Sequence, residues 1–251
     1  MSRDRKPVHF EDSECKSIIY ESADAYMLIS YHGVGQFADG KKMDIWIVDT
    51  LIELSKTAAS IKDTILGIKD RATEYFKRSC GSFPHSFVLT GWLFTPNPRP
   101  IIMIISNYER FLDNKISRSP IAESEFTESW IRLRKDTTHG CGMYCGGLFD
   151  KVQEKDWSTL KRIAQAKGAK PEDIIAFIVK TIRGAADRSK YIGKNCMSCF
   201  STAREITASC SYHPNESSAL SYAPHYFSTK GIAIRNVETW TGSGLPPWRK
   251  C

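Results

Sequence analysis

Cysteine, histidine and glycine gather in the stretch THGCGMYCGG. His139 and Cys141 begin this group, Cys145 follows, and a second pair, Cys196 and Cys199, lies later in the chain. Paired thiolates and imidazoles are the usual ligands of structural zinc, and a thiol near a histidine is the combination used by cysteine nucleophiles. These residues therefore indicate two chemistries: a zinc centre built from both cysteine pairs, and a thiol hydrolase in which His139 serves Cys141 or Cys196.

The glycines of the same stretch allow a third interpretation. Gly140 and Gly142 flank Cys141, and glycine lets another part of the molecule approach the backbone closely. A phosphate-binding loop would also need a lysine followed by serine or threonine, which this stretch lacks. The segment 140–142 is therefore predicted to be either a loop where another part of the molecule approaches the backbone closely or a plain glycine turn into a helix.

The second cysteine pair argues against zinc. In a strand through 196–200, side chains three positions apart point to opposite faces, so Cys196 and Cys199 share a metal only if the chain turns between them. Eight cysteines in a chain of this kind are expected to be reduced, and free cysteine is a common small buried residue. We therefore expect no metal and no cofactor, with a Cys/His zinc site as the alternative.

Composition limits the class of protein. The chain has 251 residues, 41% hydrophobic and 25% charged, which favours one ordinary globular domain. No apolar run is long enough to cross a membrane, and the charged start MSRDRKPVHFED is not a secretory signal, so we expect a cytoplasmic protein. The net charge is +7, but basic residues are mixed with acidic ones, so no nucleic-acid partner is predicted.

Periodicity predicts strands and helices in blocks. The stretches 17–20 and 25–31 are β-prone, flank a polar turn and form a hairpin that ends at Gly33. Helical spacing of apolar residues recurs in four segments, and further β-prone segments separate them. The predicted helices are 43–57, 60–78, 156–167 and 171–187, and the other predicted strands are 86–94, 100–108 and parts of 129–140, 194–202 and 230–240. Such blocks predict an α+β domain whose helices cover antiparallel sheets.

This order of elements over about residues 14–205 resembles the proteasome-subunit branch of the N-terminal-nucleophile (Ntn) hydrolases. It is also similar to bacterial proteasome-like proteins in SYHGVG followed by a tryptophan-containing helix. As in the family, a lysine stands at the start of the hairpin 17–31 and a glycine at its end. The glycine-rich stretch THGCGMYCGG stands where the family has a glycine-serine-glycine loop. The stretch NCMS stands where the family has an aspartate, two further residues and a serine. The corresponding residues are Lys16, Gly33, Cys141, Asn195 and Ser198.

The resemblance implies a four-layer αββα sandwich and threonine-type peptidase-like chemistry. In the family the first residue of the mature chain attacks a carbonyl, and its own amine is the base. Lys16 would assist electrostatically, the N–H of Gly33 would stabilise the oxyanion, and Asn195 and Ser198 would orient the amine beside Cys141. A peptide or amide substrate and a homo-oligomer are expected, and these residues should converge on one cleft. The alternatives are that Lys16 is a surface lysine and Gly33 an ordinary turn glycine.

The chain departs from the family at its start. Few residues precede Lys16, so the first hairpin with the nucleophile is predicted to be missing, and Ser2, exposed by removal of Met1, is the candidate nucleophile. Asn195 also replaces an acid, which removes a charge that would hold the amine. We therefore expect a hydrolase in origin that is catalytically incomplete as given. Either a segment lies upstream, or the protein is a noncatalytic scaffold or binding subunit whose open sheet edge pairs with a partner.

The domain prediction follows from the same order. We expect residues 14–240 to form a single Ntn-hydrolase-like domain. A flexible segment, 1–13, precedes it, and an irregular tail, 241–251, follows it.

Overall fold

The computed structural model describes residues 16–79, 81, 83–94, 98–112, 115–131, 149–189, 192–194, 196–201, 208–213, 215, 225–229 and 232–236. Its α-helices are α1 (Met43–Leu54), α2 (Ile61–Ser79), α3 (Glu154–Gln165) and α4 (Pro171–Ala186), and a short 3-10 helix covers Phe149–Lys151. The first strands are β1 (Ser17–Glu21), β2 (Ala25–His32), β3 (Ser86–Leu93), β4 (Arg99–Ser106), β5 (Glu109–Leu112) and β6 (Lys115–Arg118). The later strands are β7 (Thr127–Ile131), β8 (Cys196–Ser201), β9 (Ala208–His213), β10 (His225–Thr229) and β11 (Ile232–Asn236).

A seven-stranded sheet with the order β11-β10-β1-β2-β3-β4-β7 dominates the fold. All neighbouring strands in it are antiparallel except β1 and β10, which run parallel. Parallel neighbours require a long connection. In the sequence, all the elements from β2 to β9 lie between β1 and β10. Two smaller antiparallel sheets, β5–β6 and β8–β9, complete the described strands.

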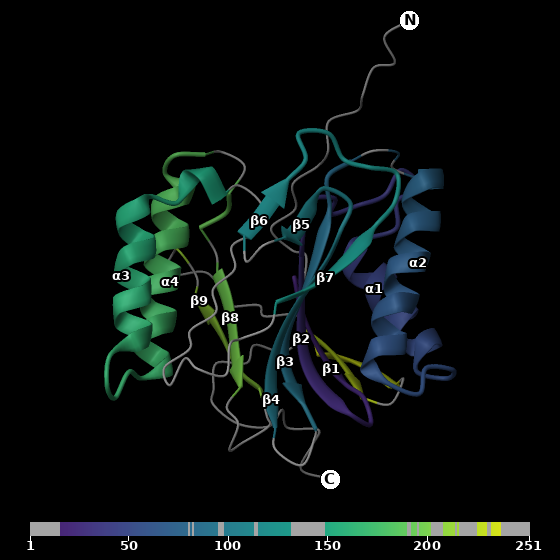
Figure 1. Cartoon of the computed structure of the whole chain (residues 1–251), viewed down its shortest axis with the longest axis horizontal. Coiled ribbons are helices and arrows are strands. Elements are labelled where there is room, and N and C mark those ends of the chain that lie inside the picture. Colours follow the sequence, from purple (N-terminus) through teal and green to yellow (C-terminus); the bar gives the residue numbers. More distant parts are fainter. Residues whose placement is uncertain are drawn as a thin grey trace, which may run out of the picture.

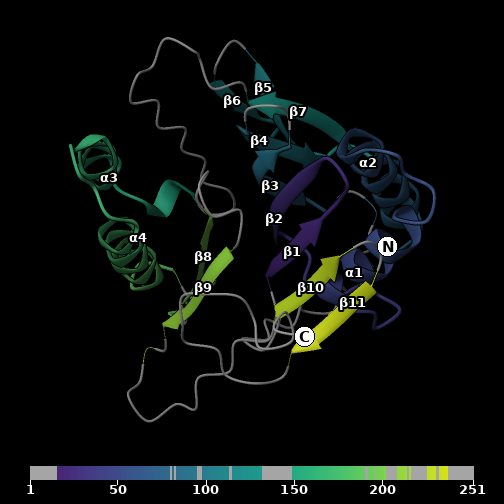
Figure 2. The same cartoon turned by 90° about the horizontal axis from the view of Figure 1, so that it is seen from below.

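Helices lie on both sides of these sheets. Figure 1 shows α1 and α2 against one face of the large sheet, with α3 and α4 on the far side of the molecule. The β8–β9 hairpin lies between α3–α4 and the large sheet, and Figure 2 shows the same order from below. One hydrogen bond joins the two sheets, from Trp92 Nε1 of β3 to Ser201 Oγ of β8 at 3.0 Å.

The main core lies between the large sheet and the α1–α2 pair. Ile47 and Leu51 of α1 and Ile65 and Ile68 of α2 are fully buried, as their helical spacing predicts. The two helices also approach closely at Gly67, because a Cβ there would lie 2.3 Å from Leu54 Cδ2. Burial of this apolar stripe is the principal stabilisation of the sheet and its helical layer.

The predicted α+β class is confirmed, and all four predicted helices are present within a few residues of their predicted bounds. Two features differ from prediction. The large sheet is not purely antiparallel, because β1 and β10 run parallel. The outer edge of β1, which was expected to be open because the nucleophile hairpin is predicted to be missing, is paired with β10. Among the described helices, none has the length and apolar character needed to cross a membrane.

Candidate functional site

Lys16 and Gly33 lie at the same end of the large sheet. Lys16 directly precedes β1 and Gly33 directly follows β2. Because Ser17 pairs with Ser30 in this hairpin, Lys16 is level with Tyr31, close to Gly33 along the neighbouring strand. The Lys16 side chain is exposed to solvent. This exposure also fits the alternative in which Lys16 is a surface lysine.

Gly33 is a close-approach glycine. Its φ is +114°, a conformation that side-chain-bearing residues rarely adopt. A Cβ at this position would lie 2.3 Å from the carbonyl oxygen of Pro84 and 2.9 Å from His85 Cα. The chain at 33 therefore packs directly onto the segment that leads into β3, and only glycine fits without a shift of backbone.

His85 is the residue against which this turn packs. Its side chain is completely buried, and its Nδ1 accepts a hydrogen bond from the Val34 N–H at 3.0 Å. The ring stacks on Tyr31 with 5.9 Å between ring centroids and meets Phe87 edge-on at 4.6 Å. Burial holds the pKa of His85 well below its usual value, with smaller electrostatic effects from the neighbouring His32 and Lys16. The ring is therefore neutral.

Three polar residues form a row across the strand ends beside this histidine. His32 pairs with Ser86 in register, and Ser86 pairs with Ser106. Ser86 Oγ lies 2.6 Å from Ser106 Oγ. The strands β2, β3 and β4 each bring one of these polar side chains to the same end of the large sheet. The three residues therefore form one side of a hydrophilic cluster.

A fully buried carboxylate lies behind the row. Glu109 has no solvent exposure, yet it accepts hydrogen bonds from Arg118 Nε at 2.7 Å and Ser86 Oγ at 2.9 Å. His32 Nε2 lies 3.5 Å from the same carboxylate. Burial of an ionised carboxylate is costly unless opposite charge and hydrogen bonds compensate, and Glu109 has both.

The other nitrogen of His32 contacts a phenol. Tyr108 Oη lies 3.2 Å from His32 Nδ1, and the two rings meet edge to face. Burial and the nearby Glu109 carboxylate raise the pKa of Tyr108, so its hydroxyl stays protonated. The order hydroxyl, imidazole, carboxylate is an arrangement that can transfer a proton, with the imidazole oriented by the buried acid.

Sequence reasoning did not single out His32, Tyr108 or Glu109. A signal for them existed, since His32 directly precedes the close-approach glycine and Glu109 is an acid at the start of a β-prone run. Neither signal shows that the two residues meet, because His32 ends β2 of the large sheet and Glu109 begins β5 of the separate β5–β6 sheet.

Ser198 lies on a different sheet from Lys16 and Gly33. Its Oγ is 2.9 Å from His213 Nε2, across the β8–β9 hairpin. Ser201 bonds Trp92 of the large sheet, and residues three positions apart on a strand face opposite sides. Ser198 therefore faces away from the large sheet, and the structure does not bring it together with Lys16 and Gly33.

The remaining predicted site residues lie outside the described residues. These are Ser2, Cys141 with the 140–142 loop, and Asn195. His139 and Cys145, which the zinc and thiol hypotheses use, lie outside them as well.

Cys196 and Cys199 belong to one continuous strand, so the turn that a shared metal would require is not present. Cys196 is buried and donates from Sγ to the carbonyl oxygen of Lys194 at 3.5 Å. Burial raises the pKa of the Cys196 thiol, which disfavours the thiolate. Within the described part of the chain, no group of three or more His, Cys, Asp or Glu residues is arranged to hold a metal ion.

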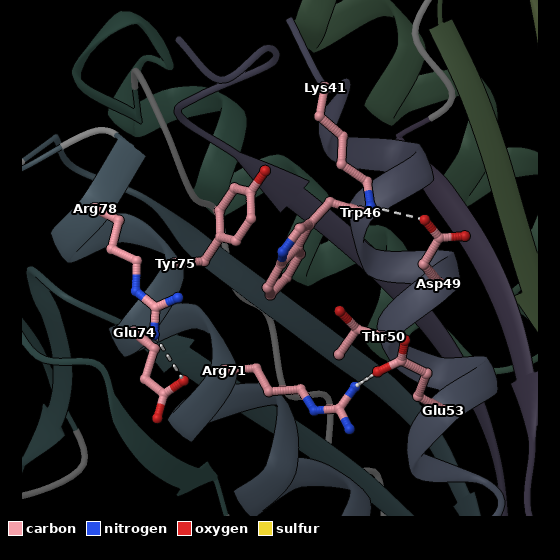
Figure 3. A pocket seen from close by; sticks show the side chains of 9 residues that line it. All are labelled: Lys41, Trp46, Asp49, Thr50, Glu53, Arg71, Glu74, Tyr75 and Arg78. Atoms are coloured by element: carbon pink, nitrogen blue, oxygen red, sulfur yellow. Dashed lines mark hydrogen bonds and ion pairs between the residues drawn. The ribbon is translucent and has the colours of Figure 1, made fainter. Parts of the chain in front are cut away.

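A separate groove lies between α1 and α2 (Figure 3). It has a volume of about 270 Å³, and Trp46 and Tyr75 stand in its middle. Three ion pairs surround these rings, and each charged lining residue has a partner of opposite sign. The pairs are Lys41–Asp49, Arg71–Glu53 and Arg78–Glu74. Because the charges compensate one another, the groove presents no excess charge to a ligand, and it is not the candidate site.

Comparisons with family models, with curated proteins and with solved structures found no match to this chain. The geometry of the cluster at the end of the large sheet is therefore the basis for assigning a function.

Proposed function

We propose that the protein is a peptide or amide hydrolase in origin that is catalytically incomplete as given, with the four-layer αββα sandwich of the Ntn hydrolases. The observation that carries this proposal is the position of Lys16 and Gly33 at one end of the β1–β2 hairpin, next to the His32–Glu109 cluster. The order of layers, with helices outside and strands inside, also supports it (Figure 1).

Each group at this sheet end has a role in the proposed reaction. The exposed Lys16 ammonium stabilises negative charge that develops on the substrate, and the N–H of Gly33 donates to the oxyanion. His32, oriented by Glu109, holds or releases a proton. The nucleophile implied by the resemblance is the N-terminal residue of the mature chain, which lies outside the described residues.

A lysine substitution tests this function. Lys16→Ala should lower the residual turnover of fluorogenic peptide amides by about 100-fold, because a preorganised charge at the reacting carbonyl is lost. Lys62→Ala, which removes an exposed lysine of α2 instead, is the matched control. Both variants should unfold at the temperature of the wild type. Equal activity in the wild type and Lys16→Ala would exclude the proposed role of Lys16.

A noncatalytic binding subunit is the second candidate. It is favoured by the internal pairing of the cluster, in which the buried Glu109 is held by Arg118, Ser86 and His32 and so stabilises the sheet end without any substrate. In this case the wild type should bind peptides without cleaving them, as measured by fluorescence anisotropy. The alternative in which the open edge of β1 pairs with a partner protein is not supported, because β10 pairs with that edge.

A further inference from the structure

The β8–β9 hairpin presents a hydroxyl and an imidazole on one face. Cys196 pairs with His213 and Ser198 pairs with Ser211, so Ser198 and His213 are diagonal neighbours on the same side of the sheet. Ser198 Oγ lies 2.9 Å from His213 Nε2. This is the distance at which a base takes the proton of an attacking hydroxyl.

Arg183 of α4 holds the neighbouring ends of the two strands of this hairpin. Its Nη2 donates to the carbonyl oxygen of His213 at 3.2 Å, and its Nε donates to the carbonyl oxygen of Lys194 at 3.3 Å. Lys194 leads into β8 and His213 ends β9, so one guanidinium holds the neighbouring ends of both strands. Arg183 is therefore a positioning residue for the histidine and not a group that reacts.

The protonation state of His213 suits a base. Burial lowers the pKa of His213, and the positive charge of Arg183 lowers it further. The other groups near the ring are Ser198 and Cys196 of β8, and the Cys196 thiol stays protonated because burial raises its pKa. The imidazole is therefore neutral at pH 7, and Nε2 can accept the proton of the Ser198 hydroxyl when Nδ1 carries the ring hydrogen.

We propose that Ser198 and His213 form a nucleophile–base pair that hydrolyses small carboxylic esters, at a site distinct from the cluster at the end of the large sheet. The proposal does not depend on peptide or amide hydrolysis. It also gives Ser198 a role other than the orientation of a terminal amine.

The reaction has two steps. Ser198 Oγ attacks the ester carbonyl carbon while His213 Nε2 takes the hydroxyl proton, and the carbon–oxygen bond to the alcohol then breaks as the imidazolium returns that proton to the leaving oxygen. Water next attacks the acyl-serine carbonyl and gives a proton to His213. Cleavage of the acyl–Oγ bond releases the acid, and the proton returns to Ser198 Oγ. The sum is ester plus water to acid plus alcohol.

A serine-directed probe tests the pair. A fluorophosphonate should label the purified full chain, and mass spectrometry of its peptides should find the label on Ser198. Ser198→Ala should abolish labelling and the hydrolysis of p-nitrophenyl acetate, and His213→Gln should slow both by about 100-fold, since general-base assistance contributes about that much. Ser211→Ala is the matched control, because Ser211 pairs with Ser198 on the same face, and it should label at the rate of the wild type.

Two further results decide the outcome. Labelling of the wild type should fall on acidification with a midpoint below the ordinary histidine value of about 6.5, because burial lowers the pKa of His213, and this measurement does not depend on whether His213→Gln folds. Absence of label, label on another serine, or equal labelling of Ser198→Ala would each overturn the proposal.

Discussion

Glu109 and Arg118 face each other across the β5–β6 hairpin. They are paired residues in the strand register, and Arg118 Nε donates to Glu109 Oε1 at 2.7 Å. Arg118 keeps some solvent exposure, whereas the carboxylate has none. The guanidinium therefore compensates a charge that water cannot reach.

Removal of Arg118 should be strongly destabilising. Arg118→Leu leaves the Glu109 charge buried with only its neutral donors and His32, and the free energy of unfolding should fall by about 3–5 kcal/mol. Arg110→Ala removes the exposed pair between Arg110 of β5 and Glu123 and should cost less than about 1 kcal/mol. Urea unfolding measures both, and equal losses would contradict the buried-charge interpretation.

A side chain at Gly33 should be costly for two reasons. Gly33→Ala forces alanine into a positive φ and drives its Cβ toward the Pro84 carbonyl oxygen. Gly40→Ala is the control, since Gly40 also has a positive φ but nothing lies within 4 Å of its Cβ. The control should cost about 1–2 kcal/mol from backbone strain alone, and Gly33→Ala should cost clearly more by urea unfolding. Equal costs would mean that the contact with residues 84 and 85 relaxes freely.

Stability should fall on mild acidification because of His85. The folded state keeps this ring neutral while the unfolded chain binds a proton below about pH 6.5. The unfolded state therefore binds more protons as the pH drops, and the free energy of unfolding is expected to decrease from pH 6.5 downward and to be constant above it. Urea midpoints between pH 7.5 and 5 measure this. His213 contributes with the same sign, so His85→Phe should flatten the slope without abolishing it.

The Trp92–Ser201 hydrogen bond should couple the two sheets. Trp92→Phe and Ser201→Ala each remove the bond, so the double variant should lose less stability than the two single losses added together. A double-mutant cycle by thermal unfolding should give a coupling of about 1 kcal/mol. Ser201→Ala combined with Thr90→Ala, a change elsewhere on β3, should show additive losses. Additivity in the Trp92 cycle would mean that the hairpin docks by other contacts.

The sequence predicts those elements whose pattern is local. The helices α1 and α2 follow from apolar residues at helical spacing, and the β1–β2 hairpin follows from two β-prone runs around a polar turn. The strands β9 and β10 were not predicted, because ASCSYH and HYFST lack a regular alternation of apolar and polar residues. The pairing of β10 with β1 also depends on a part of the chain that is distant in sequence.

The candidate site likewise has one part that the sequence predicts and one part that it does not predict. Lys16 and Gly33 lie at the same end of the large sheet because they belong to one hairpin, which sequence spacing indicates. The contact between His32 and Glu109 depends on the register of three successive strands and on a fold of the chain after β4. No local sequence pattern encodes such a register, so the contact between His32 and Glu109 is seen only in the structure.

The parallel pair of β1 and β10 has a consequence for synthesis of the protein on the ribosome. Ile18 pairs with Tyr226, so the middle of the large sheet cannot close until nearly the whole domain has been translated. Contacts of such sequence separation slow folding, and the outer edge of β1 stays open to other chains in the meantime. The nascent chain should therefore need protection by chaperones until β10 emerges.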